Sequence, residues 1–296
     1  MQLEPRIHHL PVNERGRDLI VGDLHGCRAA LDRLLDEAGF DPAADRLISV
    51  GDLTDRGPDH AGCLALLEEP WFHAVRGNHD EMILRAASTF QPERLLALCN
   101  EPPQPGDEPR RDLRGNGGNW LLDLIDRRED LPWLFARIEQ LGQLPHILVV
   151  GGGAWRYNVV HADLTTLRTP TGFWRDHELD EGWFHGRGEE VVEHATWSRA
   201  VHHEYTLPTA WAPGLSRTYC GHTIQEQPVQ RSSHCCIDTG AFVGYRDRHQ
   251  KLLSRPALTL VEHRPDAVPT WSAVVRERTV TGCVQGLIDA EGRYRS

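Results

Sequence analysis

Short apolar segments recur along the chain, and each ends at a glycine or at a cluster of polar residues. Segments of three or four such residues, bounded by turn-forming residues, are typical of strands that are buried on both faces of a sheet. We therefore predict buried strands at residues 18–21, 47–50, 72–75, 147–150, 157–160 and 235–237.

Between the first three of these strands the apolar positions change to helical spacing. Residues 27–40 place apolar side chains on one face of a helix, and Gly39 predicts where that helix ends. Residues 58–69 repeat the pattern after the second strand. Strands that alternate with helices in this way indicate an α/β arrangement that starts with a parallel sheet.

The second half of the chain has more strand-like segments and fewer predicted helices, which favours a mixed sheet or a two-sheet sandwich. Residues 100–118 are rich in proline and glycine and predict a loop. Residues 169–190 are irregular but carry four large aromatic side chains, so they form either a local hydrophobic core or a flap over a binding site. These aromatic residues are Phe173, Trp174, Trp183 and Phe184.

Composition narrows the class of protein. The chain has 296 residues, of which 40% are hydrophobic and 25% charged, enough for one large or two small globular domains. A net charge of -11 argues against broad binding to nucleic acid or to anionic membranes. Seven scattered cysteines without a Cys-x-x-Cys pair predict reduced thiols and a cytoplasmic location. We see no secretory signal and no apolar run of membrane-spanning length.

Polar residues of similar kinds follow the predicted strands one after another. Because ligands bind beyond the carboxyl ends of strands in open α/β sheets, these residues are expected to gather in one region. The segments are Gly22-Asp23-Leu24-His25-Gly26, Gly51-Asp52-Leu53-Thr54-Asp55-Arg56-Gly57, Arg76-Gly77-Asn78-His79-Asp80, His161-Ala162-Asp163, Gly221-His222-Thr223 and Asp238-Thr239-Gly240.

Aspartate, histidine and asparagine together suit a divalent metal ion. Asp23 and His25 are two residues apart on chain that leaves a strand, so the alternation of side chains predicts that both point the same way. Each segment alone has an ordinary explanation, such as a polar turn, or a helix cap at Asn78. The repetition at several strand ends is what favours a metal site.

Other histidines and cysteines in the sequence predict no site. We expect Cys235 and Cys236 to belong to the core. The pairs His8-His9 and His202-His203 are expected to be surface or local packing residues.

The order and spelling of the motifs resemble the phosphoprotein phosphatase family of calcineurin-like metallophosphoesterases, in particular the bacterial and phage branch that includes the phage lambda protein phosphatase. The resemblance covers roughly residues 18–262 and rests on "GDLHG", "GDLTDRG" and "RGNHD", followed by "GNGGNW", "HAD", "WSR", "GHT" and "DTGA". It implies an α/β (α+β) fold, a β-sandwich of mixed sheets flanked by helices. Residues 1–262 would form the catalytic domain, with an extension at 263–296 packed on or beside it.

The resemblance also implies two divalent metal ions and their ligands. One ion would be held by Asp23, His25 and Asp52, and the other by Asn78, His161 and His222 together with the bridging Asp52. Manganese is the favoured metal, with iron, zinc and magnesium as alternatives. A hydroxide that bridges the ions would attack phosphorus.

The family further implies roles for residues outside the metal ligands. Arg56, Arg76 and Arg199 would hold the phosphoryl oxygens, for which bidentate arginine is well suited. His79 would protonate the leaving alcohol, and Asp55 would orient it.

The sequence departs from the eukaryotic members at two places. Asp80 stands where those members carry glutamate, and we expect it to favour the start of the next helix. Ala162-Asp163 stands where they carry two glycines, and an acidic residue there is expected to repel some substrates.

The expected function is hydrolysis of phosphomonoesters on serine, threonine or tyrosine of a phosphorylated protein, or of a small phosphoester. One alternative is hydrolysis of bis(5'-nucleosyl) tetraphosphates, but enzymes of that kind typically lack the intact Asp55-Arg56-Gly57 found here. The acidic composition counts against the other alternative, a nucleic-acid or nucleotide phosphoesterase. A non-enzymatic binding module would have lost ligands, and every implied ligand is present.

Overall fold

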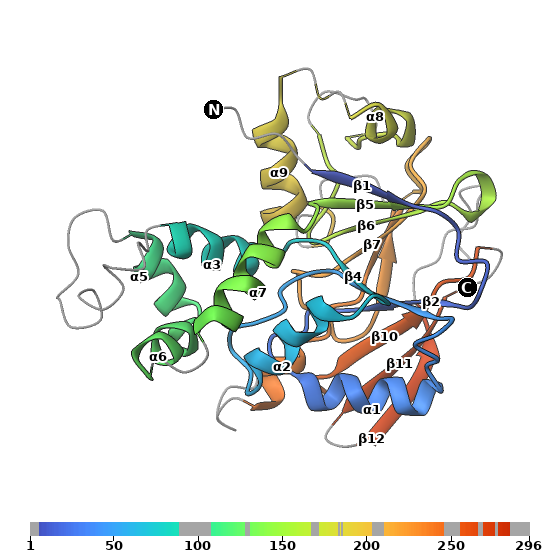
Figure 1. Cartoon of the computed structure of the whole chain (residues 1–296). Helices are drawn as coiled ribbons and strands as arrows, with labels where there is room; N and C mark the ends of the chain where they lie inside the picture. Colours follow the sequence, from blue (N-terminus) through green and yellow to red (C-terminus); the bar gives the residue numbers. More distant parts are fainter. Residues whose placement is uncertain are drawn as a thin grey trace.

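The computed structural model describes residues 6–88, 108–127, 131–166, 172–182, 184, 186–202, 210–245, 255–265, 269–275 and 278–284. Its strands form two mixed sheets (Figure 1). The strands are β1 (Ile7–Leu10), β2 (Asp18–Val21), β3 (Arg46–Ser49), β4 (Phe72–Ala74), β5 (Ile147–Val150), β6 (Tyr157–Val160), β7 (Arg217–Cys220), β8 (Val229–Arg231), β9 (His234–Cys236), β10 (Leu258–Glu262), β11 (Thr270–Val275) and β12 (Arg278–Cys283).

The helices lie between and beside these strands. They are α1 (Arg28–Ala38), α2 (His60–Ala65), α3 (Asn78–Ser88), α5 (Glu108–Gly115), α6 (Asn119–Arg127), α7 (Leu131–Gln143), α8 (Asp176–Glu181) and α9 (Gly188–Trp197), with short 3-10 turns at Leu66–Glu68, Gly153–Trp155 and Ala241–Tyr245. The helix predicted from residues 27–40 is confirmed. It ends at Gly39, whose φ of 58° is the left-handed conformation that glycine adopts without strain.

The first sheet has the strand order β12-β11-β10-β2-β3-β4. Strands β2, β3 and β4 are parallel, which confirms the predicted α/β beginning. Strand β10 then pairs with β2 in the antiparallel direction, and β11 and β12 continue the sheet by antiparallel pairing. The described part of the C-terminal segment therefore extends a sheet that the N-terminal segment begins.

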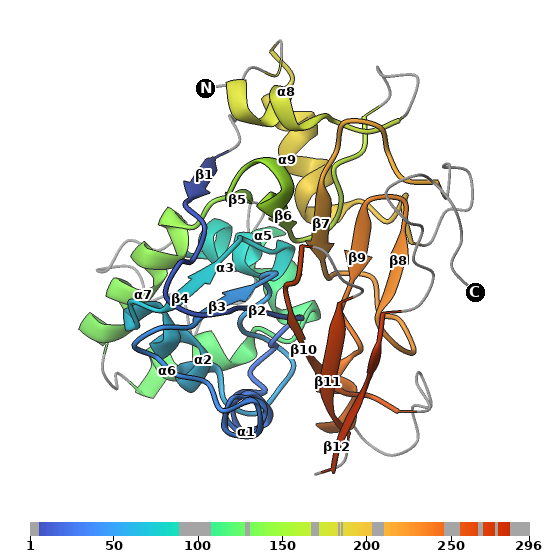
Figure 2. The same ribbon diagram turned by 90° about the vertical axis from the view of Figure 1, so that its right-hand side faces the viewer.

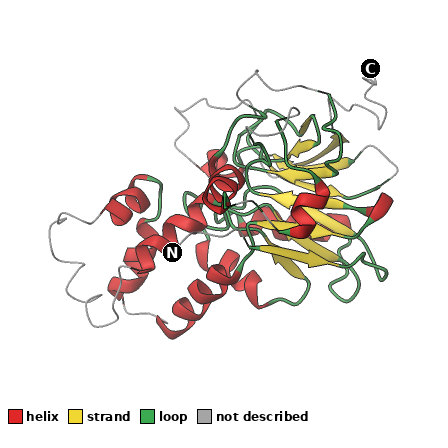
Figure 3. Ribbon diagram, turned by 90° about the horizontal axis from the view of Figure 1, so that it is seen from above, coloured by secondary structure: helices red, strands yellow, loops and turns green. Residues whose placement is uncertain are grey.

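The second sheet has the order β1-β5-β6-β7-β9-β8. Its strands β6, β7 and β9 are parallel, whereas β5 and β8 run antiparallel to their neighbours β6 and β9. Figure 2 shows the strands of the two sheets stacked on each other, and Figure 3 shows helices on the outside of the strands. The expected sandwich of mixed sheets flanked by helices is therefore confirmed.

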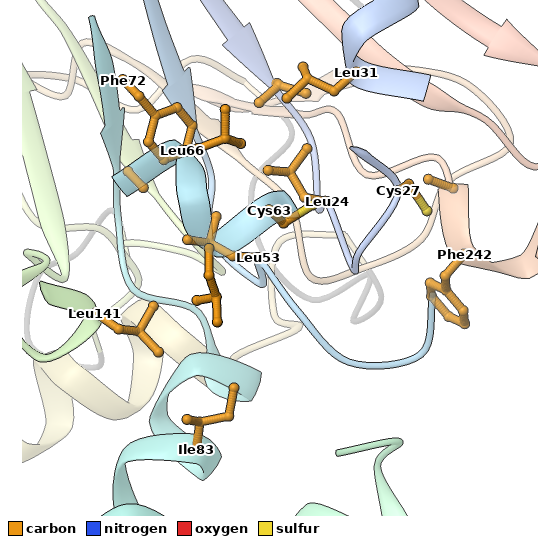
Figure 4. Packing of buried hydrophobic residues seen from close by; sticks show 14 of the residues in the cluster. Leu24, Cys27, Leu31, Leu53, Cys63, Leu66, Phe72, Ile83, Leu141 and Phe242 are labelled. Atoms are coloured by element: carbon orange, nitrogen blue, oxygen red, sulfur yellow. The ribbon is translucent and has the colours of Figure 1, made fainter. Parts of the chain in front are cut away.

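Alternation along the strands divides the buried side chains into three cores. Ile20 and Ile48 point between the sheets, whereas Leu19 and Leu47 on the same strands point toward helices α1, α2, α3 and α7. Figure 4 shows other members of this second cluster, among them Leu31, Phe72 and Leu141. Side chains such as Val149 point outward from the second sheet, toward α8 and α9. Burial on both faces explains why these strands read as continuous apolar runs.

The loop predicted at 100–118 is wrong for residues 108–115, which form helix α5, whereas residues 116–118 form a turn. Pro109 lies in the first turn, where a proline costs no helical hydrogen bond. Leu113 is fully buried in the core between the helices and the first sheet. Residues 100–107 lie outside the described residues. Helices α6 and α7 were also not predicted, although α7 packs against α3 in that core.

The described residues of the aromatic segment at 169–190 form a local core rather than an open flap. Phe173, Trp174 and Phe184 are buried and join Val149 and Val160 in the core outside the second sheet. The rings of Trp174 and Phe184 meet edge to face, with centroids 5.2 Å apart. Trp183, which the flap interpretation also used, lies outside the described residues.

Candidate metal centre and active site

The predicted polar residues gather at the carboxyl ends of strands from both sheets. The first sheet supplies Asp23 after β2, Asp52 after β3 and Asn78 after β4. The second sheet supplies His161 after β6 and His222 after β7. Asn78 Oδ1 lies 2.9 Å from His161 Nε2 and 3.0 Å from His222 Nδ1, so the two sheets meet at this cluster.

Three histidines are oriented by backbone carbonyls. The His25 Nδ1 is 2.8 Å from the Thr54 carbonyl, the His161 Nδ1 is 2.8 Å from the Val50 carbonyl, and the His222 Nε2 is 3.0 Å from the Trp197 carbonyl. Each ring thus donates one N–H to the backbone and presents its other nitrogen to the cluster, as metal-binding histidines do. Burial lowers the pKa of all three imidazoles, that of His222 to about 2, so they are neutral.

Asp52 lies between two groups of donor atoms. One of its oxygens is 3.4 Å from His25 Nε2 and the other is 3.5 Å from His161 Nε2. Donor atoms of Asp23, Asp52 and His161 lie within 4.8 Å of one another, and so do those of His25, Asp52 and His79. This central placement is what a bridging ligand needs.

Within the described part of the chain, the buried carboxylates of Asp23 and Asp52 form no ion pair with an arginine or lysine. Burial raises the pKa of Asp23, and the neighbouring charges of Asp238 and Asp52 raise it further. Burial acts to raise the pKa of Asp52, but the surrounding histidine side chains, His161 first, and the Arg56 guanidinium favour the charged carboxylate and lower its pKa. Buried carboxylates of this kind are normally paired or bound to a metal ion.

The backbone leaves room for these carboxylates. A Cβ atom on Gly221 would overlap Asp23 Oδ1, and a Cβ atom on Gly77 would overlap Asp52 Oδ1. Aspartate, asparagine and neutral histidine are the donors that borderline and hard divalent metals prefer. The residues therefore fit a divalent metal centre.

Left-handed backbone conformations concentrate at the site. Six non-glycine residues in the described part of the chain have positive φ, and five of them belong to the motifs. Because such conformations are unfavourable for residues other than glycine, their clustering is typical of a functional site. They are His25 (42°), Asp52 (50°), Asp55 (69°), Arg56 (70°) and His222 (63°).

His25 corrects one step of the sequence argument. Strand β2 ends at Val21, and the left-handed φ of His25 is incompatible with an extended chain. Asp23 and His25 do approach each other, with His25 Nε2 4.0 Å from Asp23 Oδ2, but a turn brings them together rather than the alternation of a strand.

His79 and Asp55 form a buried pair beside the cluster. The His79 Nδ1 is 2.7 Å from Asp55 Oδ2, and among the described residues the His79 Nε2 has no hydrogen-bond partner. The edge of the ring contacts His25, with centroids 4.8 Å apart. One nitrogen is thus anchored by a carboxylate, while the other remains available beside the donor cluster.

A residue that was not singled out from the sequence completes this pair. The Trp120 Nε1 donates a hydrogen bond of 2.7 Å to Asp55 Oδ1. Trp120 is the last residue of the segment "GNGGNW", which belongs to the motifs shared with the phosphatase family. The sequence motif therefore includes Trp120 but does not indicate its contact with Asp55.

Two of the three predicted arginines border a cavity of about 510 Å³ beside the donor cluster. Arg56 lies 2.9 Å from His25 Nε2 and 4.7 Å above the ring of Phe242. Arg199 donates to the His222 carbonyl at 2.9 Å. Asn116, Thr223 and Ile224 complete much of the lining.

The third arginine, Arg76, is directed elsewhere. Its guanidinium donates to Glu81 Oε1 at 2.7 Å and to the carbonyls of Gly142 and Leu144 at 2.7 and 3.1 Å. These bonds join the start of α3 to the end of α7. This geometry favours a role in holding the segment that carries Asn78 over contact with substrate.

The two departures from the family pattern are buried. Asp80 lies in the first turn of α3, as expected, and its carboxylate also accepts N–H groups of Gly77, Asp52 and Leu53. Asp163 is only 1% exposed and accepts hydrogen bonds from Thr165. The Asp163 carboxylate therefore does not face solvent, and its expected effect on substrates stays a prediction.

The expected roles of the remaining histidines and cysteines agree with the structure where it describes them. Cys235 and Cys236 are buried in the core, and the Cys236 thiol donates to the Thr223 carbonyl. His202 is buried with its Nε2 3.6 Å from Cys220 Sγ, whereas His8 and His9 are exposed. The five cysteines whose burial is described are all free thiols. No helix in the described part of the chain is long and apolar enough to span a membrane.

Comparisons with known proteins agree with this geometry. Residues 17–227 match the family described as "Calcineurin-like phosphoesterase". The chain is 40% identical to "Serine/threonine-protein phosphatase 1" of Salmonella typhimurium over 226 residues, which covers 76% of this chain and 87% of the relative. It is 43% identical to the symmetrical bis(5'-nucleosyl)-tetraphosphatase of an Acidovorax species over 204 residues, covering 67% of this chain and 59% of the relative.

A solved structure supports the fold. The crystal structure of a cold-active protein-tyrosine phosphatase of a psychrophilic Shewanella species superposes with a TM-score of 0.50 at 14% identity, covering 95% of this chain and 83% of that chain. Members of the matched family are hydrolases that use a dinuclear metal centre, and the Asp, His and Asn cluster suits one. The chain belongs to the calcineurin-like metallophosphoesterase family.

Proposed function

We propose that this enzyme hydrolyses phosphomonoesters on serine and threonine side chains of proteins, with phosphotyrosine as a further substrate. The observation that carries the proposal is the Asp55–His79 pair, whose free nitrogen lies beside the donor cluster. The alkoxide of serine or threonine is a poor leaving group, so its departure requires a proton from a positioned acid. The similarity to a serine/threonine-protein phosphatase over most of both chains supports the same substrate class.

We propose two divalent ions, most simply Mn²⁺, held by the six ligand residues that the motifs supply. Asp23, His25 and Asp52 would hold one ion, and Asp52 would share the second with Asn78, His161 and His222. When bound, such ions polarise a phosphoryl oxygen and lower the pKa of water.

The residues of the chain then divide the remaining work. His79 gives a proton through Nε2 to the leaving oxygen, and Asp55 holds the ring by accepting the Nδ1 hydrogen. Arg56 and Arg199 border the cavity and bind the phosphoryl oxygens through their planar guanidinium groups. Arg76 keeps the Asn78 segment in place. Free buried thiols support a reducing location, for which we propose the cytoplasm.

Hydrolysis of dinucleoside tetraphosphates is the second candidate. It is favoured by the similarity to a tetraphosphatase and by a cavity lined with two arginines and Phe242, which suits a nucleotide. The intact Asp55-Arg56-Gly57 segment favours the monoesterase instead.

A substrate panel tests the proposal. Metal-stripped enzyme would be supplied with Mn²⁺, Mg²⁺ or Zn²⁺ and assayed on a phosphoserine peptide, a phosphotyrosine peptide, p-nitrophenyl phosphate, its bis-ester and diadenosine tetraphosphate. We expect the largest metal-dependent kcat/KM on the phosphopeptides. A preference for the tetraphosphate would replace the first candidate by the second, and lack of metal-dependent turnover on every substrate would refute both.

A further inference from the structure

Trp120 in helix α6 contacts the Asp55–His79 pair, which lies in a different part of the chain. It lies in the first turn of α6, 65 residues after Asp55 in the sequence. Its indole N–H donates to Asp55 Oδ1 at 2.7 Å, while Asp55 Oδ2 is 2.7 Å from the Nδ1 of His79. The two oxygens of one buried carboxylate therefore hold the indole on one side and the imidazole on the other.

The indole is itself held firmly in place. It stacks on His60, with ring centroids 4.7 Å apart and planes inclined by 25°. The segment before it docks on the same loop, because the Arg56 N–H points to the Gly117 carbonyl at 3.5 Å. Gly117 has a φ of 96°, and a Cβ atom there would lie 3.0 Å from the Arg56 nitrogen. The turn before α6 is therefore shaped to fit against the loop that carries Asp55.

Asp55 needs the hydrogen bond from Trp120 because its carboxylate is buried. Its side chain is fully buried, and its backbone has a left-handed φ of 69°. A buried carboxylate oxygen that loses its hydrogen bond is costly, and the group rotates to find another donor. Rotation of Asp55 would also move Oδ2 away from His79.

We propose that Trp120 is a positioning residue for catalysis, which fixes the Asp55 carboxylate and, through it, the direction of the His79 ring. The inference rests on the proposed role of His79 as the acid. Loss of a group that orients a metal-bound histidine typically costs about 10- to 100-fold in activity, and we expect an effect of similar size here. The competing explanation is that Trp120 only packs α6 against the core, in which case its N–H is dispensable.

The test removes the N–H and keeps an aromatic ring. Trp120→Phe would be compared with wild type on phenyl phosphate, whose leaving group needs a proton, and on p-nitrophenyl phosphate, whose leaving group needs it much less. We expect kcat on phenyl phosphate to fall about 10- to 100-fold, with KM unchanged and little loss on p-nitrophenyl phosphate. Trp133→Phe is the matched control, because Trp133 is a partly buried tryptophan of α7 that packs against the same core. It should behave as wild type on both substrates.

Combining the substitution with His79→Asn separates the inference from the proposed function. If Trp120 acts through His79, Trp120→Phe has no further effect in the His79→Asn background. An equal loss in both backgrounds, or equal losses on both substrates, would overturn the positioning role. If His79→Asn alone slows the two substrates equally, it is the proposed acid that fails.

A measurement on the unaltered tryptophan covers the case in which Trp120→Phe does not fold. In protein labelled with ¹⁵N-tryptophan, the Trp120 indole proton should be protected from exchange. It should shift in Asp55→Asn but remain in place in Trp133→Phe. If the chemical shift of the Trp120 indole proton does not change in Asp55→Asn, the hydrogen bond between Trp120 and Asp55 would be contradicted.

Discussion

Strand β2 has a buried aspartate near each of its ends, and the two have opposite electrostatic surroundings. Asp18 opens the strand and is paired with the Arg46 guanidinium through two hydrogen bonds of 2.7 and 2.8 Å. It also accepts the Tyr157 hydroxyl at 2.7 Å. Asp23 follows the strand and faces Asp52 and Asp238, which raise its pKa in addition to the larger effect of burial.

The difference separates the end of the sheet at which buried charges are paired from the end at which the candidate metal ligands gather. At the amino end, opposite charges are paired, so removing either partner would leave an uncompensated buried charge. At the carboxyl end, the carboxylates of Asp23 and Asp52 lie close to each other and to the His161 imidazole, an arrangement that suits a bound cation. That region also contains five strained left-handed residues, which a fold selected only for stability would avoid.

Replacing Asp23 by asparagine should give the largest change in activity and is the strongest test of the contrast between Asp18 and Asp23. We expect activity to fall about 10⁴-fold, because a metal ion supplies several kcal/mol of transition-state stabilisation. The melting temperature of the metal-stripped protein should rise, since one of the mutually repelling carboxylates is removed. Differential scanning calorimetry with and without Mn²⁺ measures this, and a metal-stripped variant that melts below wild type would contradict the account.

His79→Asn tests the acid at the functional end. Cleavage of a phosphoserine peptide should slow by about 10²–10⁴, the usual contribution of a general acid. The loss on p-nitrophenyl phosphate should be smaller, because that leaving group departs without a proton. Steady-state kinetics on both substrates measure the ratio, and equal losses would argue against the assignment.

Arg46→Met tests the stabilising end. It leaves the buried Asp18 carboxylate without its partner, which should cost about 3–5 kcal/mol of unfolding free energy. Urea denaturation measures the loss, while kcat/KM of the folded fraction should stay near that of wild type. If Arg46→Met lowered activity as strongly as stability, the contrast between the two ends of strand β2 would be contradicted.

Arginine-to-lysine changes at two positions give the smallest expected effect. Arg199→Lys should raise KM for phosphopeptide about 10-fold, because a charge-assisted hydrogen bond contributes about 1.5–3 kcal/mol. Arg76→Lys should instead lower the melting temperature with KM nearly unchanged, since its guanidinium bridges Glu81 and two carbonyls. A KM increase in Arg76→Lys as large as that in Arg199→Lys would restore the phosphate-binding role expected from the family.

The sequence predicted six of the strands and the first helix because each of these is a local pattern. Strands β2, β5 and β6 have the predicted bounds, and motif residues directly follow β2 and β6. Residues of helix α5 were predicted as a loop because the segment around them is rich in proline and glycine. What stabilises the helix is the burial of Leu113 against other helices, which the sequence alone does not show.

By itself the sequence determined which residue types stand at each strand end, and that was enough to identify the family and its candidate metal ligands. Only the tertiary structure decided their directions. His25 reaches the cluster through a left-handed turn, Arg76 turns away to Glu81, and Trp120 crosses to Asp55 from a separate helix. The physical reason is that side-chain direction depends on backbone turns and on contacts between segments far apart in the chain, which no local pattern of polar and apolar residues records.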